Sequence, residues 1–260
     1  NPDKAIDWFK KAAEKGDMYS MRMLGVCYES KKFLGEAYGW YRKAADKSEL
    51  FSIAKIVNAF KTGAGNISQD LSQYEDWYIK AVELAANEAE EADAETLLEI
   101  GKMLSLHLPP DKIKAFGYFK RSSDAGQPQS YAITANLAME GFGDNYNDAI
   151  YYFTKAAELN DDADAMNKLG TIYFGELVPS KKDTKLAVRW LTAAALKGQA
   201  DASNYLGRLY LTGNGVEINF KKAFDLFAVA ATKKHPAGQW NLGRCYHQGW
   251  GTAKDLQKAL

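Results

Sequence analysis

The sequence predicts an all-α protein, a right-handed superhelical α/α solenoid of about seven helix-turn-helix repeats that forms one continuous domain over residues 1–260. The first observation behind this prediction is a Leu-Gly pair with a tyrosine three positions after the glycine. It recurs at Leu24-Gly25, Leu169-Gly170, Leu206-Gly207 and Leu242-Gly243. The last three copies are about 36 residues apart, a period typical of small helical repeats.

A second motif, out of phase with the first, marks the other helix of each repeat. It consists of a small residue, an aromatic pair three residues later and two further small residues, as in Ala37, Trp40-Tyr41 and Ala44-Ala45. Its copies place the repeat starts near Ala5, Ala37, Tyr74, Ala115, Ala149, Ala187, Ala223 and Ala259. The first helix of each repeat therefore carries the Leu-Gly motif, and the second helix carries the aromatic pair.

Helix-start signals lie four residues before each of these repeat starts. The positions hold Asn1, Phe33, Asp70, Asp111, Asn145, Asp183, Asn219 and Asp255. Asn and Asp side chains accept hydrogen bonds from the free amides of a first turn, so the second helices are predicted to begin there, with Phe33 as the exception. Glycines follow the first helices and are predicted to end them, at Gly63, Gly141, Gly213 and Gly249.

The glycine of the Leu-Gly pair is predicted to be a spacer between helices. Glycine inside a helix costs about 1 kcal/mol relative to alanine, so its recurrence needs a packing reason. Because glycine has no Cβ, the partner helix can approach closely there, with large side chains facing small ones across the contact.

These residues resemble the Sel1-like repeat family, which is related to the tetratricopeptide repeats. The best match is the stretch that holds Ala202, Leu206-Gly207, Tyr210, Gly213, Gly215-Val216, Ala223 and Ala230-Ala231. The resemblance covers essentially the whole chain and weakens in the middle. There, Ile56-Val57 replaces Leu-Gly, Ile100-Gly101 keeps the glycine, and Leu137-Ala138 keeps the leucine.

The resemblance implies a non-enzymatic scaffold or adaptor for protein–protein interactions, of the kind that assembles signalling, secretion, cell-envelope or protein-degradation complexes. Two other functions stay open. One is a dedicated inhibitor or immunity protein that neutralises a secreted effector. The other is a cell-wall or carbohydrate-binding module, which 15 Tyr and 6 Trp would favour, although most of them occupy repeat core positions.

Candidate binding residues follow from the geometry of tetratricopeptide-type solenoids, in which the first helix of each pair lines the concave face. Residues one or two positions from the glycine, or three before it, are predicted to face this groove. They are Arg22, Asn58, Lys102, Asn136, Asn167, Lys168, Asn204, Tyr205, Arg208, Trp240, Asn241 and Arg244. Asn and Arg side chains beside aromatic rings suit an extended peptide, held through its backbone amides and a carboxylate. The alternative is an ordinary polar stripe that faces solvent.

Composition excludes several classes of function. With 33 basic and 33 acidic residues, the chain lacks the basic surface that nucleic-acid binding needs. No stretch approaches the roughly 20 apolar residues of a membrane span. The three histidines fall in separate repeats without metal-ligand spacing, and no nucleophile has a catalytic signature. We therefore expect no catalytic residue, metal or cofactor. Cys27 and Cys245 lie in distant repeats, which predicts no disulfide.

Two irregular regions carry expectations of their own. An acidic, alanine-rich insertion near Glu88–Glu95 is predicted to lengthen the neighbouring helices, or alternatively to dock a basic partner. The chain stops at Leu260, inside a predicted second helix. We therefore expect a longer parent protein, or an end-to-end or homo-oligomeric contact through the uncapped C-terminal repeat. The compartment is left open between the cytoplasm and, after removal of a leader, the periplasm or the exterior.

Overall fold

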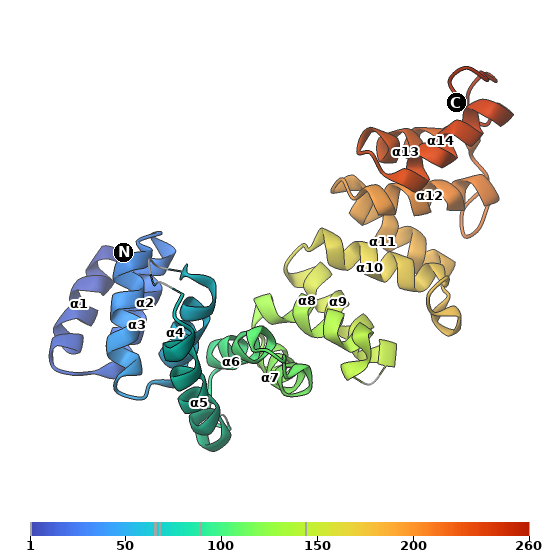
Figure 1. The fold of residues 1–260 in the computed structure, drawn as a ribbon. Helices are drawn as coiled ribbons and strands as arrows, with labels where there is room; N and C mark the ends of the chain where they lie inside the picture. Colours follow the sequence, from blue (N-terminus) through green and yellow to red (C-terminus); the bar gives the residue numbers. More distant parts are fainter. Residues whose placement is uncertain (1, 65–66, 68, 89, 144, 260) are drawn as a thin grey trace. The chain divides into compact units, whose positions relative to one another are not determined.

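The computed structural model describes residues 2–64, 67, 69–88, 90–143 and 145–259. These residues contain fourteen α-helices and, within the described ranges, no β-strand. The predicted all-α class of helix-turn-helix repeats is therefore confirmed. By contact the chain divides into two compact units, residues 1–146 and 147–260. Figure 1 labels the helices of both. The expected continuity of the repeats as one domain stays a prediction.

The first unit holds eight α-helices and one π-helical turn. They are α1 (Pro2–Glu14), α2 (Met18–Ser30), α3 (Leu34–Ala45), α4 (Leu50–Thr62), α5 (Leu71–Glu88), α6 (Ala94–Leu106), α7 (Lys112–Asp124), α8 (Pro128–Leu137) and η2 (Ala138–Phe142). Successive helices pack on each other except α5 and α6, and the complete repeats are the pairs α2/α3, α4/α5 and α6/α7. In addition, α4 packs directly on α6, the first helix of the next repeat.

The second unit holds the remaining helices. They are α9 (Asn145–Leu159), which begins at the division, α10 (Ala163–Phe174), the 3₁₀ turn η3 (Pro179–Lys181), α11 (Thr184–Leu196), α12 (Ala200–Thr212), α13 (Phe220–Thr232) and α14 (Pro236–Gln248). The complete repeats here are α10/α11 and α12/α13, and the first helices α10, α12 and α14 also contact one another in sequence.

The predicted helix starts agree with the observed caps. The Asp111 carboxylate accepts from the Lys114 amide at 3.0 Å, Asp183 from the amides of Lys185 and Leu186, and Asn219 from Lys222. Asp70 accepts from Ser72 and Gln73, and Asp255 from Gln257 and Lys258 at the start of a final turn. Phe33 makes no side-chain cap, as expected.

Two of the predicted N-cap residues, Asn145 and Asn1, are not observed as caps. Asn145 is the first residue of α9 rather than its cap, because the first turn begins one residue earlier than the motif spacing indicated. Asn1 lies outside the described residues.

The predicted helix ends hold with one exception. Gly63, Gly213 and Gly249 end α4, α12 and α14 in the left-handed conformation, with φ of 75°, 72° and 77°. Gly141 instead has φ 97° inside η2, where α8 widens into a π turn, so it does not cap an α-helix.

The repeated glycines are spacers, as predicted. A Cβ on Gly25 would lie 2.2 Å from the Tyr41 ring, and one on Gly101 would lie 2.7 Å from the Phe119 ring. In the second unit, Gly170 faces Leu191 at 2.6 Å and Gly207 faces Phe227 at 2.7 Å. In each case the facing residue is the second member of the aromatic-pair motif on the next helix. That side chain therefore packs directly on the backbone of the first helix.

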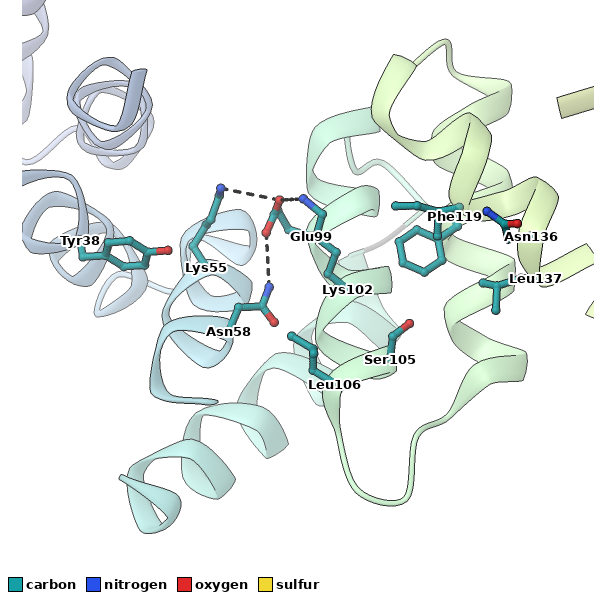
Figure 2. A pocket seen from close by; sticks show the side chains of 11 residues that line it. Tyr38, Lys55, Asn58, Glu99, Lys102, Ser105, Leu106, Phe119, Asn136 and Leu137 are labelled. Atoms are coloured by element: carbon teal, nitrogen blue, oxygen red, sulfur yellow. Dashed lines mark hydrogen bonds and ion pairs between the residues drawn. The ribbon is translucent and has the colours of Figure 1, made fainter. Parts of the chain in front are cut away.

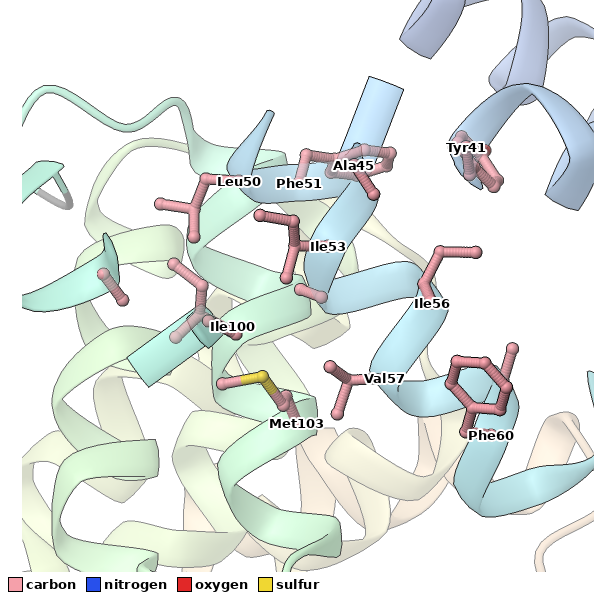
Figure 3. Close-up of a cluster of buried hydrophobic side chains, with 14 of the residues drawn as sticks. Tyr41, Ala45, Leu50, Phe51, Ile53, Ile56, Val57, Phe60, Ile100 and Met103 are labelled. Atoms are coloured by element: carbon pink, nitrogen blue, oxygen red, sulfur yellow. The ribbon is translucent and has the colours of Figure 1, made fainter. Parts of the chain in front are cut away.

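The helix that lost the motif, α4, is buried on several sides. Ile53 and Val57 lie on the side of α4 toward Ile100 and Met103 of α6, while Ile56 lies on the side toward Tyr41 (Figure 3). These side chains are all fully buried. A helix enclosed in this way is apolar around most of its circumference, and Val57 stands where four other first helices have a glycine packed against the next helix.

Candidate functional site

The twelve predicted binding residues all lie on the first helices of the repeats, but their surroundings differ between the two units. Arg22, Asn58, Lys102 and Asn136 lie on α2, α4, α6 and α8 of the first unit. The second unit holds the other eight. Asn167 and Lys168 lie on α10, Asn204, Tyr205 and Arg208 on α12, and Trp240, Asn241 and Arg244 on α14.

In the second unit, three buried asparagines lie on successive first helices. The Asn241 side-chain amide donates to the Asn204 carbonyl oxygen at 2.8 Å, and both residues are buried. Asn167 is 9% exposed, and its Oδ1 atom has no hydrogen-bond partner among the described residues. We name Asn167, Asn204 and Asn241 the amide row. The structure thus joins Asn204 and Asn241, which the sequence placed on separate helices, by a hydrogen bond.

Two arginines flank the amide row, each held against aromatic rings. The Arg208 guanidinium pairs with Glu176 and lies 4.8 Å from the centre of the Phe174 ring and 5.4 Å from that of Tyr205. Burial, reinforced by the Glu176 carboxylate, raises the pKa of Tyr205. These contacts fix the plane of the guanidinium and leave donors for a further acceptor.

The second arginine, Arg244, lies 4.6 Å from the Trp240 ring centre and 5.1 Å from that of Trp250. Trp240 is 63% exposed, which is unusual for a tryptophan on a repeat helix. Lys168, on α10, is also exposed. The surface of α10, α12 and α14 therefore combines buried amides, two oriented guanidinium groups and an open aromatic ring.

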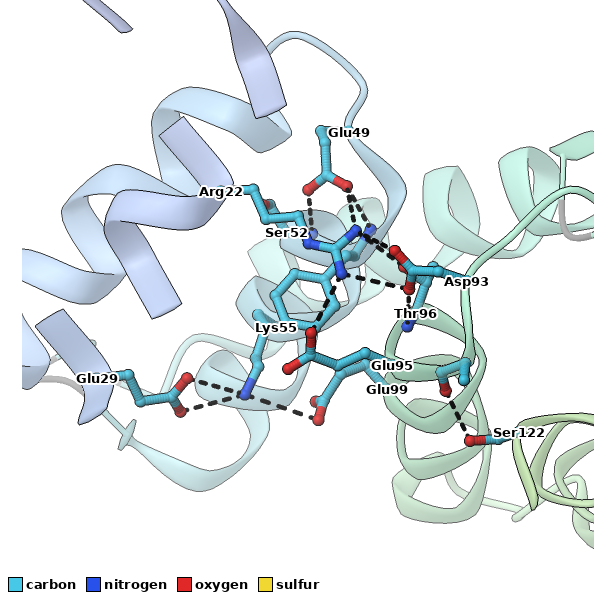
Figure 4. A network of polar contacts seen from close by, with 12 residues as sticks. Arg22, Glu29, Glu49, Ser52, Lys55, Asp93, Glu95, Thr96, Glu99 and Ser122 are labelled. Carbon is cyan, nitrogen blue, oxygen red and sulfur yellow. Dashed lines mark hydrogen bonds and ion pairs between the residues drawn. The ribbon is translucent and has the colours of Figure 1, made fainter. Parts of the chain in front are cut away.

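In the first unit, Arg22 is buried and bound within the chain. It is only 6% exposed, and its guanidinium contacts Asp93 at 2.8 Å and Glu95 at 3.3 Å (Figure 4). Glu49 lies 3.7 Å away, and the Phe51 ring centre lies 4.1 Å from the guanidinium carbon. The structure therefore gives Arg22 acidic partners instead of the open groove position that the sequence indicated. Those partners come largely from the acidic insertion.

The acidic insertion itself is only partly helical. It extends α5 to 18 residues, five more than α4 or α6, while residues 90–93 form a connection and Asp93 caps α6. Burial raises the pKa of Asp93, but hydrogen bonds from Arg22 and from the Thr96 amide more than offset it, so the net shift is downward. The predicted lengthening thus applies to α5 alone, and two of the acidic side chains are used internally.

A second polar network crosses α2, α4 and α6. Glu99 is buried, and its carboxylate contacts Lys102 at 2.7 Å, Asn58 at 3.3 Å and Lys55 at 3.7 Å. Lys55 also contacts Glu29 at 3.1 Å. Burial lowers the pKa of Lys55, but the carboxylates of Glu99 and Glu29 outweigh it and hold that pKa above its usual value. Lys55 and Glu99 can therefore both stay charged although they are buried, because each is paired with groups of opposite charge.

Lys55 and Glu99 were not among the predicted binding residues, although they too lie two positions before the glycine position of their repeats. They stand two residues before Val57 and Gly101, at the position that Lys168 and Tyr205 hold in the second unit. Their contacts depend on α2, α4 and α6 packing together, and no local signal in the sequence indicates that a lysine and a glutamate of different repeats pair.

Asn58, Lys102 and Asn136 lie on one pocket of about 510 Å³ in the first unit (Figure 2). Its lining also includes Tyr38, Lys55, Glu99, Ser105, Leu106, Phe119, Ile133 and Leu137. The Asn136 amide donates to the Ala132 carbonyl at 2.8 Å. Three of the predicted residues therefore meet at one concave site.

Other kinds of site are not found in the described ranges. Over residues 2–64, 67, 69–88, 90–143 and 145–259, no three His, Cys, Asp or Glu side chains gather as they would around a metal ion. Nor does any helix in the part of the chain that the structure describes have the length and apolarity to cross a membrane. Cys27 and Cys245 are both free cysteines in this structure.

Comparison with known proteins assigns most of the chain to one repeat type. The Sel1 repeat model matches residues 1–17, 34–49, 97–127, 135–161, 163–199, 200–235 and 236–260. Residues 50–96, which hold α4, α5 and most of the acidic insertion, fall outside the match.

Relatives of known description are matched over part of their length. The ERAD-associated E3 ubiquitin-protein ligase component HRD3B of Arabidopsis thaliana is 36% identical over 96 residues, covering 36% of this chain and 15% of that protein. Chitin synthase regulatory factor 2 of Schizosaccharomyces pombe is 30% identical over 146 residues, covering 52% of this chain and 28% of the relative. The chain therefore spans less than a third of the length of these relatives.

Solved structures show the same fold. A protective antigen of uropathogenic Escherichia coli, described as having an SLR fold, matches with a TM-score of 0.71 and 29% identity over 98% of this chain and 54% of the other. A Sel1 repeat protein from Oxalobacter formigenes matches with a TM-score of 0.65 and 19% identity over 92% of this chain and 93% of the other.

Proposed function

This chain belongs to the Sel1 repeat family, and from that premise we propose that it is a non-enzymatic adaptor that holds an extended segment of a partner protein on the surface of α10, α12 and α14. The relatives support the general role. One is named as a component of a ubiquitin ligase and another as a regulatory factor of chitin synthase. Both names describe proteins that act together with an enzyme.

The amide row is the observation that carries this proposal. A side-chain amide offers one acceptor and two donors, the same groups that an extended peptide backbone presents. The Asn204 and Asn241 amides are already aligned by their mutual hydrogen bond. The buried Oδ1 atom of Asn167 needs a donor, because an unpaired buried acceptor costs about 1–3 kcal/mol. A backbone N–H of a bound segment would supply it.

The flanking arginines support a segment that carries a carboxylate. A guanidinium binds a carboxylate through two parallel hydrogen bonds, and its orientation on an aromatic ring lowers the entropy lost on binding. Arg208 and Arg244 are both oriented in this way. The exposed Trp240 ring adds apolar contact area of the kind enriched at the centres of interfaces.

The proposal is tested with peptides selected from a random display library on the full chain. Affinities of the selected peptides are measured by fluorescence anisotropy for wild type, Asn167→Ala, Arg208→Gln and Arg244→Gln. We expect each substitution to weaken binding by about tenfold or more, since each removes a buried or charge-assisted hydrogen bond. Arg189→Gln, on the exposed second helix α11, is the matched control and should change nothing.

Two results would contradict the proposal. Either the library yields no peptide that binds the full chain, or the selected peptides bind the Asn167 and Arg208 variants as tightly as the Arg189 control.

A further inference from the structure

We propose that the pocket between α4, α6 and α8 is a second peptide-binding site, which takes an apolar side chain of leucine size flanked by acidic residues. This site lies in the first unit and does not depend on the amide row. Its volume of about 510 Å³ is in the range of pockets that enclose small ligands. Figure 2 shows that polar and apolar residues alternate around it, with Leu106 beside Asn58 and Ser105, and Asn136 beside Phe119 and Leu137.

The apolar residues of the lining favour an apolar side chain of the ligand. They come from α6, α7 and α8 and are Leu106, Phe119, Ile133 and Leu137, which we call the apolar wall. Phe119 is buried because its ring packs on Gly101, so this wall is held in place by the repeat's own helix contact. Burial of an aliphatic side chain against such a wall is favourable in proportion to the apolar area removed from water.

The Asn58 amide indicates that the ligand donates a hydrogen bond. Its Nδ2 atom donates to the Glu99 carboxylate at 3.3 Å, which fixes the orientation of the amide, because the reversed amide would place its oxygen against that carboxylate. The Oδ1 atom therefore faces away from Glu99 (Figure 2), and it is buried without a partner among the described residues. The lining of the pocket thus holds a fixed, occluded acceptor that lacks a donor.

The neighbouring charges select the kind of donor. Lys55 and Lys102 line the same pocket as Asn58. Because Lys55 is paired with Glu29 and Glu99, the half-exposed Lys102 is the cation that would repel a lysine or arginine of the ligand. A neutral backbone N–H meets no such repulsion. The ligand is therefore a peptide whose apolar residue places its own amide on the Asn58 oxygen.

Lys102 indicates that the ligand carries an acidic side chain. An ammonium group has three donors, and Lys102 directs one to Glu99 at 2.7 Å while 39% of its side chain is exposed. The buried Glu99 is already neutralised from two sides by Lys55 and Lys102. The remaining donors of Lys102 consequently favour an acidic side chain next to the apolar one.

The test uses capped tripeptides with the full chain, observed through the methyl NMR signals of Ile133 and Leu137. The probe is acetyl-Glu-Leu-Glu-amide, which places an acidic residue on both sides of the leucine. The comparison peptides are Gln-Leu-Gln, Lys-Leu-Lys and Glu-Ala-Glu, with the same caps. We expect saturable shifts with the probe, and affinities weaker by about fivefold or more for each comparison peptide.

A fourth peptide tests the Asn58 contact without altering the protein. Methylation of the leucine amide nitrogen removes the donor and should weaken binding by about fivefold or more. Lys102→Gln keeps a hydrogen-bonding group near Glu99 and should abolish the preference for Glu over Gln. Arg189→Gln, an exposed position of α11 in the other unit, should leave these affinities unchanged.

The proposal is overturned if the probe produces no saturable shift at Ile133 and Leu137. It is also overturned if N-methylation leaves the affinity unchanged, since Asn58 would then play no part in binding. Equal binding of Glu-Leu-Glu and Gln-Leu-Gln by wild type would remove the acidic requirement and with it the assigned ligand.

Discussion

The Tyr41 ring occupies the space in which a side chain at Gly25 would begin. A Cβ built on Gly25 would lie 2.2 Å from Cε1 of Tyr41, far inside contact distance. Tyr41 is fully buried, and its hydroxyl donates to Glu29 at 2.7 Å on the same helix as Gly25. Burial and this hydrogen bond raise the pKa of Tyr41. One tyrosine therefore holds α3 against α2 at two points.

Gly25→Ala should destabilise the protein by about 2 kcal/mol, because the added methyl group would force Tyr41 out of its position. Gly39→Ala is the matched control. Gly39 lies inside α3 with no atom within 4 Å of its would-be Cβ, so alanine should stabilise the helix by about 0.5–1 kcal/mol. Urea denaturation gives both values. Equal effects of the two substitutions would show that the Tyr41 contact carries no stability.

Arg22→Met should destabilise the protein by about 1–3 kcal/mol, since it removes the charge-assisted hydrogen bonds to the half-exposed Asp93 and Glu95 and leaves the mostly buried Glu49 without its cation. Methionine retains most of the aliphatic volume, so the loss reports the charge and not a cavity. Arg189→Met removes an exposed ion pair with Glu158 and should cost about 0–1 kcal/mol. If Arg22→Met lowers the free energy of unfolding no more than Arg189→Met does, solvent screens the charges around Arg22.

Asp93→Asn should reduce the acid sensitivity of the protein. The pKa of Asp93 is lowered in the folded state, so its charge contributes stability above its unfolded pKa, and that stability is lost as pH falls through the folded pKa. Asparagine keeps the cap on the Thr96 amide but carries no charge. The difference in unfolding free energy between wild type and Asp93→Asn should therefore shrink between about pH 6 and pH 2. Chemical denaturation across that range measures it, and a difference that does not change with pH would refute the assignment.

Asn204→Leu should cost about 1–3 kcal/mol, because it strands the buried Asn241 amide. The double variant Asn204→Leu with Asn241→Leu should recover part of this loss, since both partners are then apolar. The coupling energy from the double-mutant cycle, measured by denaturation, should be about 1 kcal/mol. A coupling of zero would indicate that the two amides do not interact in solution.

Much of the fold could be predicted from the sequence because the repeat is local. Gly25 and Tyr41, or Gly207 and Phe227, are separated by fewer than two helices, and their spacing alone indicates that they meet. The caps at Asp111 and Asp183 depend on neighbouring residues in the same way. The division between residues 146 and 147 was not predicted, yet it follows closely after Leu137-Ala138, where the spacer glycine is missing.

The candidate sites were predicted less completely, for a physical reason. The sequence placed Arg22 and Asn167 at the same position of the repeat, but Arg22 is bound by an acidic connection and the Asn167 oxygen is unpaired. The binding of Arg22 within the chain depends on Asp93, which lies 71 positions away in the sequence. A repeating pattern assigns a position to a residue, while the insertions that interrupt the pattern decide what that residue contacts.

The contact between Arg22 and Asp93 has a consequence for how the chain unfolds. In a simple repeat array each unit stabilises only its immediate neighbours, so the ends fray one repeat at a time. Here a side chain of α2 is bound at the start of α6, with the whole α4/α5 repeat between them in the sequence. Opening either the α2/α3 repeat or the α6/α7 repeat breaks this bond. The amide hydrogens of α2 and α6 are therefore expected to exchange together.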